Sequence, residues 1–136
     1  MKKNFNKNWK ASKQPRKQRK YSAKAPLHVK RKFLSINLSK ELRKKYQKRN
    51  MVVRKNDLVK ILRGKFKKQQ GKISEVNLKK SIVFIEKMQV KKMDGSKVNV
   101  GFEPSNLQII ELNLDDQKRL KNFGKKIKST EIKEKK

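Results

Sequence analysis

Apolar side chains are distributed unevenly along the 136 residues of the chain. They are sparse up to about Ala25 and dense between Met51 and Leu114. Only this middle segment has enough of them to bury a hydrophobic core that offsets the conformational entropy lost on folding. The pattern therefore predicts one small folded domain with extensions on both sides.

Five short runs of β-branched and aliphatic residues recur within the middle segment, each bounded by turn signals. They cover residues 57–62, 71–76, 81–86, 97–102 and 107–110. Five short strands so close together predict a mostly β fold, a small barrel. Asp94-Gly95 lies between residues 89–92 and 97–100. Because Asp-Gly readily supplies the positive φ angles of a tight turn, this pair predicts a hairpin.

The expected core consists of apolar residues in or near these runs. They are Val53, Leu58, Val59, Ile61, Ile73, Val76, Ile82, Ile85, Val98, Val100, Leu107 and Ile109. Where apolar residues are adjacent, the face that each run buries stays open, since a shift by one residue moves every side chain to the other face.

Two short helices are expected beside the barrel. Ser39 can cap a helix over residues 40–48, because its hydroxyl can accept a hydrogen bond from a free backbone N–H of the first turn. Asp115 can cap a second helix that runs to about Phe123. The expected organisation is a basic extension with the first helix over residues 1–50, a barrel over 51–112, and the second helix with a basic tail over 113–136.

Charge is concentrated where apolar residues are rare. The chain has 42 Lys and Arg against 11 Asp and Glu, a net charge of +31. Residues 1–50 alone hold 19 basic and 1 acidic side chains. Such a chain repels itself unless a polyanion neutralises it, so nucleic acid is the expected partner. Residues 1 to about 25 are expected to be disordered in the free protein and to become ordered on RNA.

The sequence lacks the residues that several other classes of function require. Without cysteine, disulfides and thiolate metal sites are excluded, and His28 is the single histidine, so no metal or cofactor is expected. Asp115-Asp116 resembles a helix cap more than a catalytic pair, so no enzyme and no small-molecule substrate is expected. The sequence has no basic helix with a continuous apolar face, and it has no apolar run of the ~20 residues that span a membrane. A cytoplasmic location is therefore expected.

The first candidate binding region combines cations with flat rings over residues 12–21 and 27–33. Arg and Lys match phosphate oxygens, and aromatic faces can stack on unpaired bases. The candidates are Trp9, Arg16, Lys17, Arg19, Lys20, Tyr21, His28, Lys30, Arg31 and Lys32, and Phe33 offers a further ring. The alternative interpretation is a solvated tail or a localisation signal.

The second candidate region is a glycine-bracketed basic loop over residues 63–73. Glycines allow the backbone to approach a sugar-phosphate chain closely. The candidates are Arg63, Gly64, Lys65, Phe66, Lys67, Lys68, Gln69 and Lys72, with Arg54, Lys79, Lys80, Lys91 and Lys92 on neighbouring segments. The loop lacks the Gly-Lys-Ser/Thr ending of a nucleotide-binding P-loop, and the alternative is an ordinary exposed hairpin loop.

Residues 52–86 resemble a KOW motif. The resemblance rests on VRKND at residues 53–57, Arg63-Gly64, and GKI at residues 71–73. Transcription elongation factors share this motif, so the flanking sequences decide. These are PRKQRK (15–20), APLHV (25–29), LSKELR (38–43) and VNVGFEPS (98–105). They resemble the archaeal and eukaryotic form of the large-subunit ribosomal protein family numbered twenty-four in bacteria and twenty-six in eukaryotes, over roughly residues 12–122.

The resemblance implies an SH3-like (KOW) barrel bound to large-subunit ribosomal RNA near its 5′ region. It also implies an early role in assembly and neighbouring ribosomal proteins around the exit of the nascent-chain tunnel. Lys68 departs from the family pattern, which usually has glycine there, so the loop is expected to follow a different turn. The competing functions are a KOW-containing regulator of transcription or translation, and a hydrolase or transferase that acts on RNA.

Overall fold

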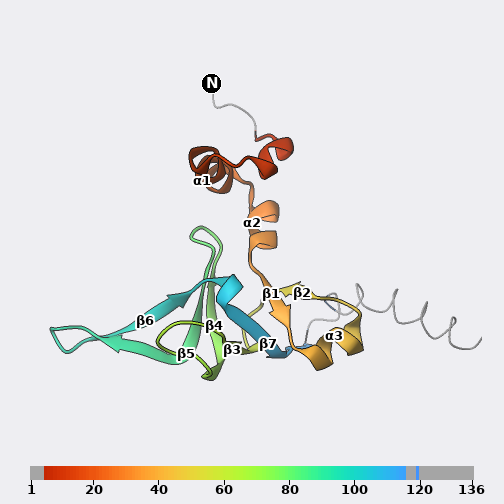
Figure 1. Ribbon diagram of the computed structural model, residues 1–136. Coiled ribbons are helices and arrows are strands. Elements are labelled where there is room, and N and C mark those ends of the chain that lie inside the picture. Colours follow the sequence, from red (N-terminus) through yellow and green to blue (C-terminus); the bar gives the residue numbers. More distant parts are fainter. Residues whose placement is uncertain (1–4, 116–118, 120–136) are drawn as a thin grey trace, which may run out of the picture.

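The computed structural model describes residues 5–115 and residue 119. The fold is mostly β, as predicted, and seven strands form one sheet in the order β2-β1-β7-β3-β4-β5-β6 (Figure 1). The strands are β1 (Ser35–Leu38), β2 (Asn50–Val52), β3 (Leu58–Ile61), β4 (Gln70–Asn77), β5 (Ile82–Lys91), β6 (Lys97–Phe102) and β7 (Leu107–Glu111). A short 3-10 helix, η2 (Pro104–Asn106), leads into β7. The five predicted runs correspond to β3 through β7, which confirms them.

β1 adds a strand from the segment expected to be an extension. It pairs in parallel with β7 and antiparallel with β2. Its apolar residues Ile36 and Leu38 are fully buried, and the intervening Asn37 is exposed. This alternation of apolar and polar residues is the pattern of a half-buried strand. The sheet therefore begins before residue 51.

The sheet is not closed into a barrel. β2 and β6 stand at its two ends, and the described strands show no pairing between them. The β5–β6 ladder is interrupted between Phe84 and Gln89, where the register shifts. Because such an irregularity bends a strand, the outer parts of β5 and β6 leave the sheet as a projecting hairpin (Figure 1). The predicted barrel is therefore an open, SH3-like sheet.

The Asp94-Gly95 hairpin is confirmed at the tip of β5 and β6. Val90 pairs with Val98 across the ladder, and Lys92 N–H donates to the Ser96 carbonyl at 2.9 Å. Gly95 has a φ of +84°, a conformation that L side chains rarely adopt. The Ser96 hydroxyl and N–H donate to the Asp94 carboxylate at 2.6 and 2.9 Å and hold the pKa of Asp94 below its usual value.

The core lies mainly under β1, β3, β5 and β7. The predicted core residues that are buried are Val53, Val59, Ile61, Ile73, Ile85, Leu107 and Ile109, and the core also includes Leu34, Ile36, Leu38, Val83, Met88 and Phe102. Of the other predicted core residues, Leu58, Val76, Ile82 and Val100 are only partly buried and Val98 is exposed. Val98 was misplaced because it sits on the projecting hairpin, and Val83 takes the buried place next to Ile82 because β5 buries alternate residues.

The predicted helix near residues 40–48 is present as α3 (Lys40–Tyr46). The Ser39 hydroxyl accepts a hydrogen bond from Leu42 N–H at 3.3 Å and caps it, as predicted. Gln47 ends the helix with a left-handed φ of 53°. The second predicted helix, near residues 115–123, lies almost wholly outside the described residues.

The N-terminal region, here called the arm, consists of η1 (Lys7–Ala11), α1 (Pro15–Lys24) and α2 (Leu27–Phe33). It stands away from the sheet (Figure 1). η1 and α1 are helical, although no secondary structure was predicted for residues 1 to about 25. The physical reason is an aromatic cluster: the Tyr21 ring lies 4.8 Å from the Phe5 ring and 6.1 Å from the Phe33 ring, centroid to centroid, and so joins α1 to α2.

Candidate nucleic-acid interface

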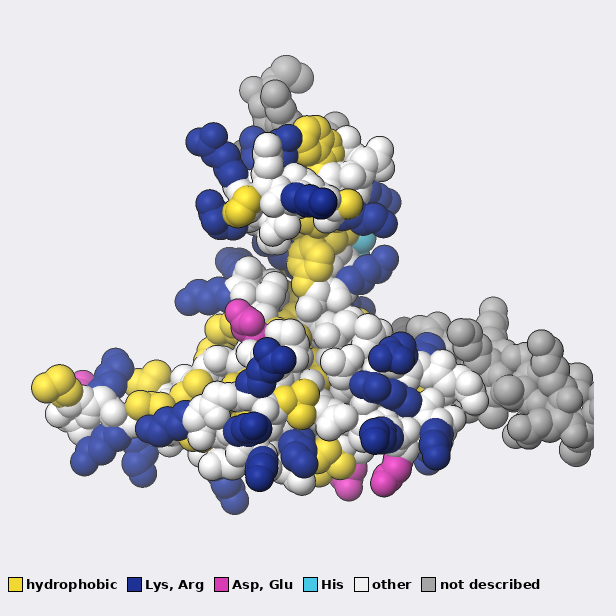
Figure 2. Space-filling view, in the orientation of Figure 1, with side chains coloured by type: hydrophobic (Ala, Val, Ile, Leu, Met, Phe, Trp, Pro, Cys, Tyr) yellow, Lys and Arg dark blue, Asp and Glu magenta, His cyan; other side chains and the backbone are white. Residues whose placement is uncertain are grey.

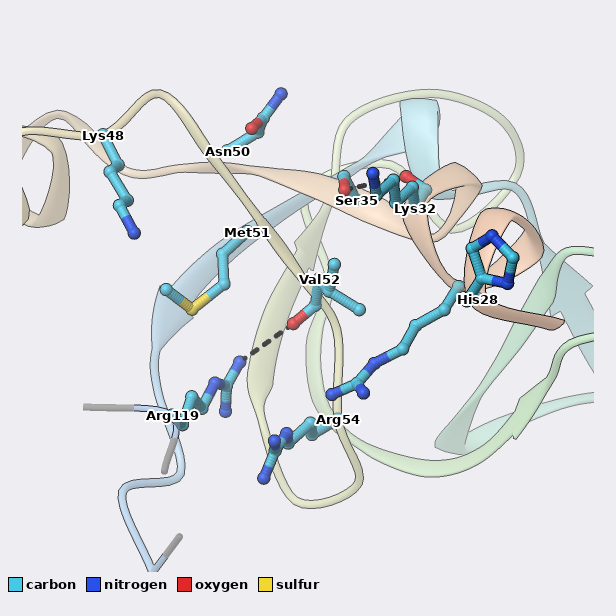
Figure 3. A pocket seen from close by; sticks show the side chains of 10 residues that line it. His28, Lys32, Ser35, Lys48, Asn50, Met51, Val52, Arg54 and Arg119 are labelled. Carbon is cyan, nitrogen blue, oxygen red and sulfur yellow. Dashed lines mark hydrogen bonds between the residues drawn. The ribbon is translucent and has the colours of Figure 1, made fainter. Parts of the chain in front are cut away.

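A buried ion pair fixes the chain where the arm meets the sheet. The Asp57 carboxylate is fully buried and binds both terminal nitrogens of Arg119, at 2.6 and 2.8 Å. It also accepts hydrogen bonds from the backbone N–H groups of Arg54 and Asn113, at 2.8 and 2.9 Å. Arg119 in turn donates to the Val52 carbonyl at 3.3 Å (Figure 3). These bonds satisfy both carboxylate oxygens of Asp57 and both terminal nitrogens of Arg119, and they hold the backbone of Arg54 in place.

Above this ion pair lies a groove of about 510 Å³, here called the cationic groove. Its basic lining residues are His28, Arg31 and Lys32 of α2, Lys48 before β2, Arg54 after β2, and Arg119. Figure 3 shows that His28, Lys48 and Arg54, among others, reach the groove from separate parts of the chain. None of the described residues that line it is acidic. Since Asp57 offsets Arg119, the remaining cations give the groove a positive field that suits phosphate groups.

α2 owes its position to its ends. Pro26 precedes its first residue. After its last turn, the Ser35 hydroxyl donates a hydrogen bond to the Lys32 carbonyl at 2.9 Å. His28 and Lys32 are four residues apart, so they lie on one face of the helix. This spacing, which is visible in the sequence, brings two predicted binding residues to the same groove.

A second hollow, here called the aromatic pocket, lies between η1, α1 and α2 and has a volume of about 590 Å³. Trp9, Tyr21, His28 and Phe33 contribute four rings to its lining. Lys7, Lys10 and Lys32 supply cations. His28 and Lys32 therefore line both the aromatic pocket and the cationic groove, which adjoin along α2.

A third hollow, which shares Trp9 and Tyr21 with the aromatic pocket, holds further predicted residues. It is lined by Lys17, Lys20 and Tyr21 as well as Trp9. The Lys17 ammonium lies 4.8 Å from the centre of the Trp9 ring, a cation–π contact. The remaining predicted cations of the arm, Arg16, Arg19 and Lys30, line none of these three hollows.

The predicted basic loop connects β3 to β4 and is exposed at Arg63, Lys65, Lys67, Lys68 and Gln69. Gly64 has a φ of +91°, as a tight turn requires. Phe66 is instead half-buried, and its ring packs edge-on against Phe102 at 5.9 Å. The ring of Phe66 is thus engaged with the core rather than presented to a ligand.

Lys68 corrects an expectation. It has a φ of 72°, so lysine has not imposed a different turn at the position where glycine is usual. Lys68 N–H donates to the Ile61 carbonyl, and Ile61 N–H donates to the Gln69 carbonyl, both at 2.9 Å. These two backbone hydrogen bonds hold the left-handed conformation against its steric cost.

The other predicted cations lie on the strands β4 and β5 and in the turns that follow them. Lys80 lies near Phe33 in a small hollow between the β4–β5 turn and the arm. Lys79 shares that turn, Lys72 lies on β4, and Lys91 and Lys92 lie on the projecting hairpin. The structure therefore brings His28, Arg31 and Lys32 together with Arg54 and places Lys80 near Phe33. It leaves the basic loop and the hairpin as separate positive sites.

Sequence reasoning missed Lys7, Lys10, Lys48 and Arg119 as lining residues. Lys48 follows α3 among several other basic residues that look like ordinary surface charge, so no local signal in the sequence marks it as a binding residue. Arg119 meets Asp57 from 62 positions away, and separation of that kind has no signature in a single sequence. Lys7 and Lys10 flank Trp9, and this basic-aromatic interleaving is the signal that was available.

Dark blue Lys and Arg side chains are scattered over the visible face of the arm and sheet, and magenta Asp and Glu side chains are few (Figure 2). In the part of the chain that the structure describes, no group of three or more His, Asp or Glu residues could hold a metal ion. Within the same residues, no helix combines the length and the apolar character that crossing a membrane requires. The described surface thus offers charge and flat rings.

Comparison with known proteins agrees with this surface. Residues 12–126 match the family of ribosomal proteins described as L26 in eukaryotes, together with its archaeal counterpart numbered twenty-four. The chain belongs to this family. A relative named "Large ribosomal subunit protein uL24" from Methanosphaera stadtmanae is 41% identical over 116 residues, which cover 85% of this chain and 99% of the relative.

Membership of this family confirms the resemblance seen in the flanking sequences. The chain is a structural ribosomal constituent and is not an enzyme, which rules out the alternative of an RNA hydrolase or transferase. Its expected location on the cytoplasmic ribosome follows from the same membership.

Proposed function

We propose that the chain is a structural constituent of the large ribosomal subunit and binds large-subunit ribosomal RNA by phosphate neutralisation and shape recognition. The observation that carries this proposal is the cationic groove. Arg31 and Lys32 of α2, Lys48 and Arg54 meet there, although they come from three parts of the chain. The relative's printed name, a large-subunit protein, supports the choice of subunit.

Binding would proceed through several separate positive sites. The cationic groove takes the RNA backbone where the arm joins the sheet, and the β3–β4 loop and the hairpin take other stretches. Each phosphate that Lys or Arg neutralises releases condensed counterions, which favours binding at low salt. Because the sheet holds these sites at fixed separations, they select a folded RNA by its shape.

Two finer proposals rest on the family. We propose an early role in assembly of the subunit, since a protein that neutralises several RNA segments at once can hold them together before other proteins arrive.

We also propose that the neighbours are ribosomal proteins around the nascent-chain tunnel exit. Mapping of cross-links from the full chain in assembled subunits tests the second proposal directly.

The decisive experiment measures the affinity of the full chain for a large-subunit ribosomal RNA fragment over a series of salt concentrations. We expect a log–log slope with a magnitude of several, because each neutralised phosphate contributes about 0.7 to 0.9. An affinity that hardly changes with salt would contradict phosphate neutralisation. Co-sedimentation with the large subunit after a salt wash tests the assignment to the ribosome, and retention on RNA polymerase instead would favour the regulator.

A further inference from the structure

We propose that the aromatic pocket binds one unpaired nucleobase of the RNA, while phosphates of the same strand lie in the cationic groove. The inference rests on the proposed function, because it concerns how the chain recognises the RNA that it binds. It adds a specific ligand to the pocket: a single-stranded or bulged nucleotide.

The rings of the pocket are of the kind on which bases stack. Trp9 is half exposed and Phe33 is 37% exposed, so both present apolar ring surface to solvent. Aromatic surface that is exposed in a hollow is typical of ligand-binding pockets. Unpaired bases stack on such rings whatever their sequence, because every base has a π-face.

The aromatic cluster gives the pocket a fixed frame. The Tyr21 ring contacts both the Phe5 ring and the Phe33 ring. Lys17, which lies over the Trp9 ring, lines the neighbouring hollow and not this one, so its ammonium leaves the aromatic pocket open. A base entering the pocket meets rings that are already in place and pays little ordering entropy.

The charges around the pocket match an anionic nucleotide and disfavour a cationic ligand. Lys7, Lys10 and Lys32 line it, and none of its described lining residues is acidic. Lys32 and His28 also line the cationic groove. A nucleotide whose base lies in the pocket therefore has its phosphates beside Lys32, from which the backbone continues directly into the groove.

Trp9 is the only tryptophan of the chain, so its fluorescence reports on the pocket without a label. The full chain is titrated with two RNA hairpins of equal length and charge, one with a bulged adenosine and one with an abasic residue at the bulge. We expect the adenosine to quench Trp9 and to raise the affinity on the order of tenfold, as base stacking on an aromatic ring does. The abasic hairpin should bind through its phosphates with little quenching.

Variants locate the effect. Phe33→Leu should reduce the preference for the bulged adenosine while leaving the affinity for the abasic hairpin much less changed, because Phe33 lines the aromatic pocket and not the cationic groove. Leu27→Ala is the matched control, because Leu27 lies on the same helix, is 65% exposed and does not line the pocket. It should keep the preference of the parent.

The outcomes separate this inference from the proposed function. Equal affinity for both hairpins, with a steep salt dependence, would overturn the pocket proposal and leave phosphate-driven RNA binding intact. Binding of neither hairpin nor any ribosomal RNA fragment would overturn both. Adenosine monophosphate serves as a separate arm: if it quenches Trp9 at the same concentrations as the RNA, the pocket is a free-nucleotide site and the RNA proposal is wrong.

Discussion

The sheet and the arm differ in how their side chains are used. Thirteen buried apolar residues form the core of the sheet region, from Leu34 to Ile109. None of the residues within η1, α1 and α2 is buried, and the arm depends on ring contacts around Tyr21. Burial stabilises the sheet, whereas the arm keeps its cations and rings accessible. Folding stability and RNA affinity should therefore respond to different substitutions.

The largest effect on folding is expected at the ion pair beneath the cationic groove. Arg119→Met should lower the free energy of unfolding by ~3 to 5 kcal/mol, because it leaves the buried Asp57 carboxylate without its opposite charge. Urea unfolding of the full chain measures this loss. Arg63→Met is the matched control, since Arg63 is exposed on the β3–β4 loop, and it should change the stability little.

A small loss for Arg119→Met would mean that residue 119 is not part of the folded unit. In that case Asp57 would be satisfied by the Arg54 and Asn113 backbone groups alone. Asp57→Asn combined with Arg119→Met distinguishes the two situations. If the pair is real, the double variant should recover part of the loss, because no uncompensated charge is then buried.

The β3–β4 loop sharpens the comparison, because it belongs to the sheet but is as exposed as the arm. Replacing Arg63, Lys65, Lys67 and Lys68 by Gln should weaken RNA binding and reduce the magnitude of the salt slope by about 0.7 to 0.9 for each phosphate that is no longer neutralised. The free energy of unfolding should stay nearly unchanged, since the substitutions open no cavity. Titration and urea unfolding at one fixed salt concentration test the affinity and the stability, and a salt series of the titration tests the slope.

Ile73→Ala is the counterpart in the core. Ile73 is fully buried, so this variant should lose ~2 to 5 kcal/mol of stability. Its affinity per folded molecule should change little. If the glutamine variant binds as tightly as the parent, the loop is an ordinary exposed connection and recognition lies in the arm.

How far the sequence predicts this fold depends on the range of the interactions involved. Residues 97–102 and the Asp94-Gly95 turn were predicted correctly, because strand alternation and turn chemistry are local. β1 was missed although Leu34, Ile36 and Leu38 alternate with polar residues, since the surrounding charge favoured an extension. The helical arm was missed because the contacts from Phe5 to Tyr21 and from Tyr21 to Phe33 are tertiary.

In the candidate site, too, the features that depend on local sequence were predicted and those that depend on distant contacts were not. Basic-aromatic interleaving identified Trp9, Tyr21, His28 and Lys32, all of which the structure brings to one pocket. The closure of the cationic groove by residues distant in the sequence could not be predicted, because a single sequence carries no record of which distant residues meet. The ion pair between Asp57 and Arg119 is the clearest example.

The smallest predicted effect concerns Lys68, whose φ of 72° places a side chain in the left-handed region. Lys68→Gly should raise the free energy of unfolding by about 1 kcal/mol, because glycine adopts this conformation without the steric cost that other residues pay, although it is also freer in the unfolded chain. Lys68→Ala is the control: it removes the same charge but keeps the Cβ, so it should not be stabilising. If glycine and alanine give equal stabilities, the loop does not hold residue 68 in the left-handed conformation in solution. The same pair of variants measures the charge separately, because both should weaken RNA binding equally if Lys68 contacts a phosphate.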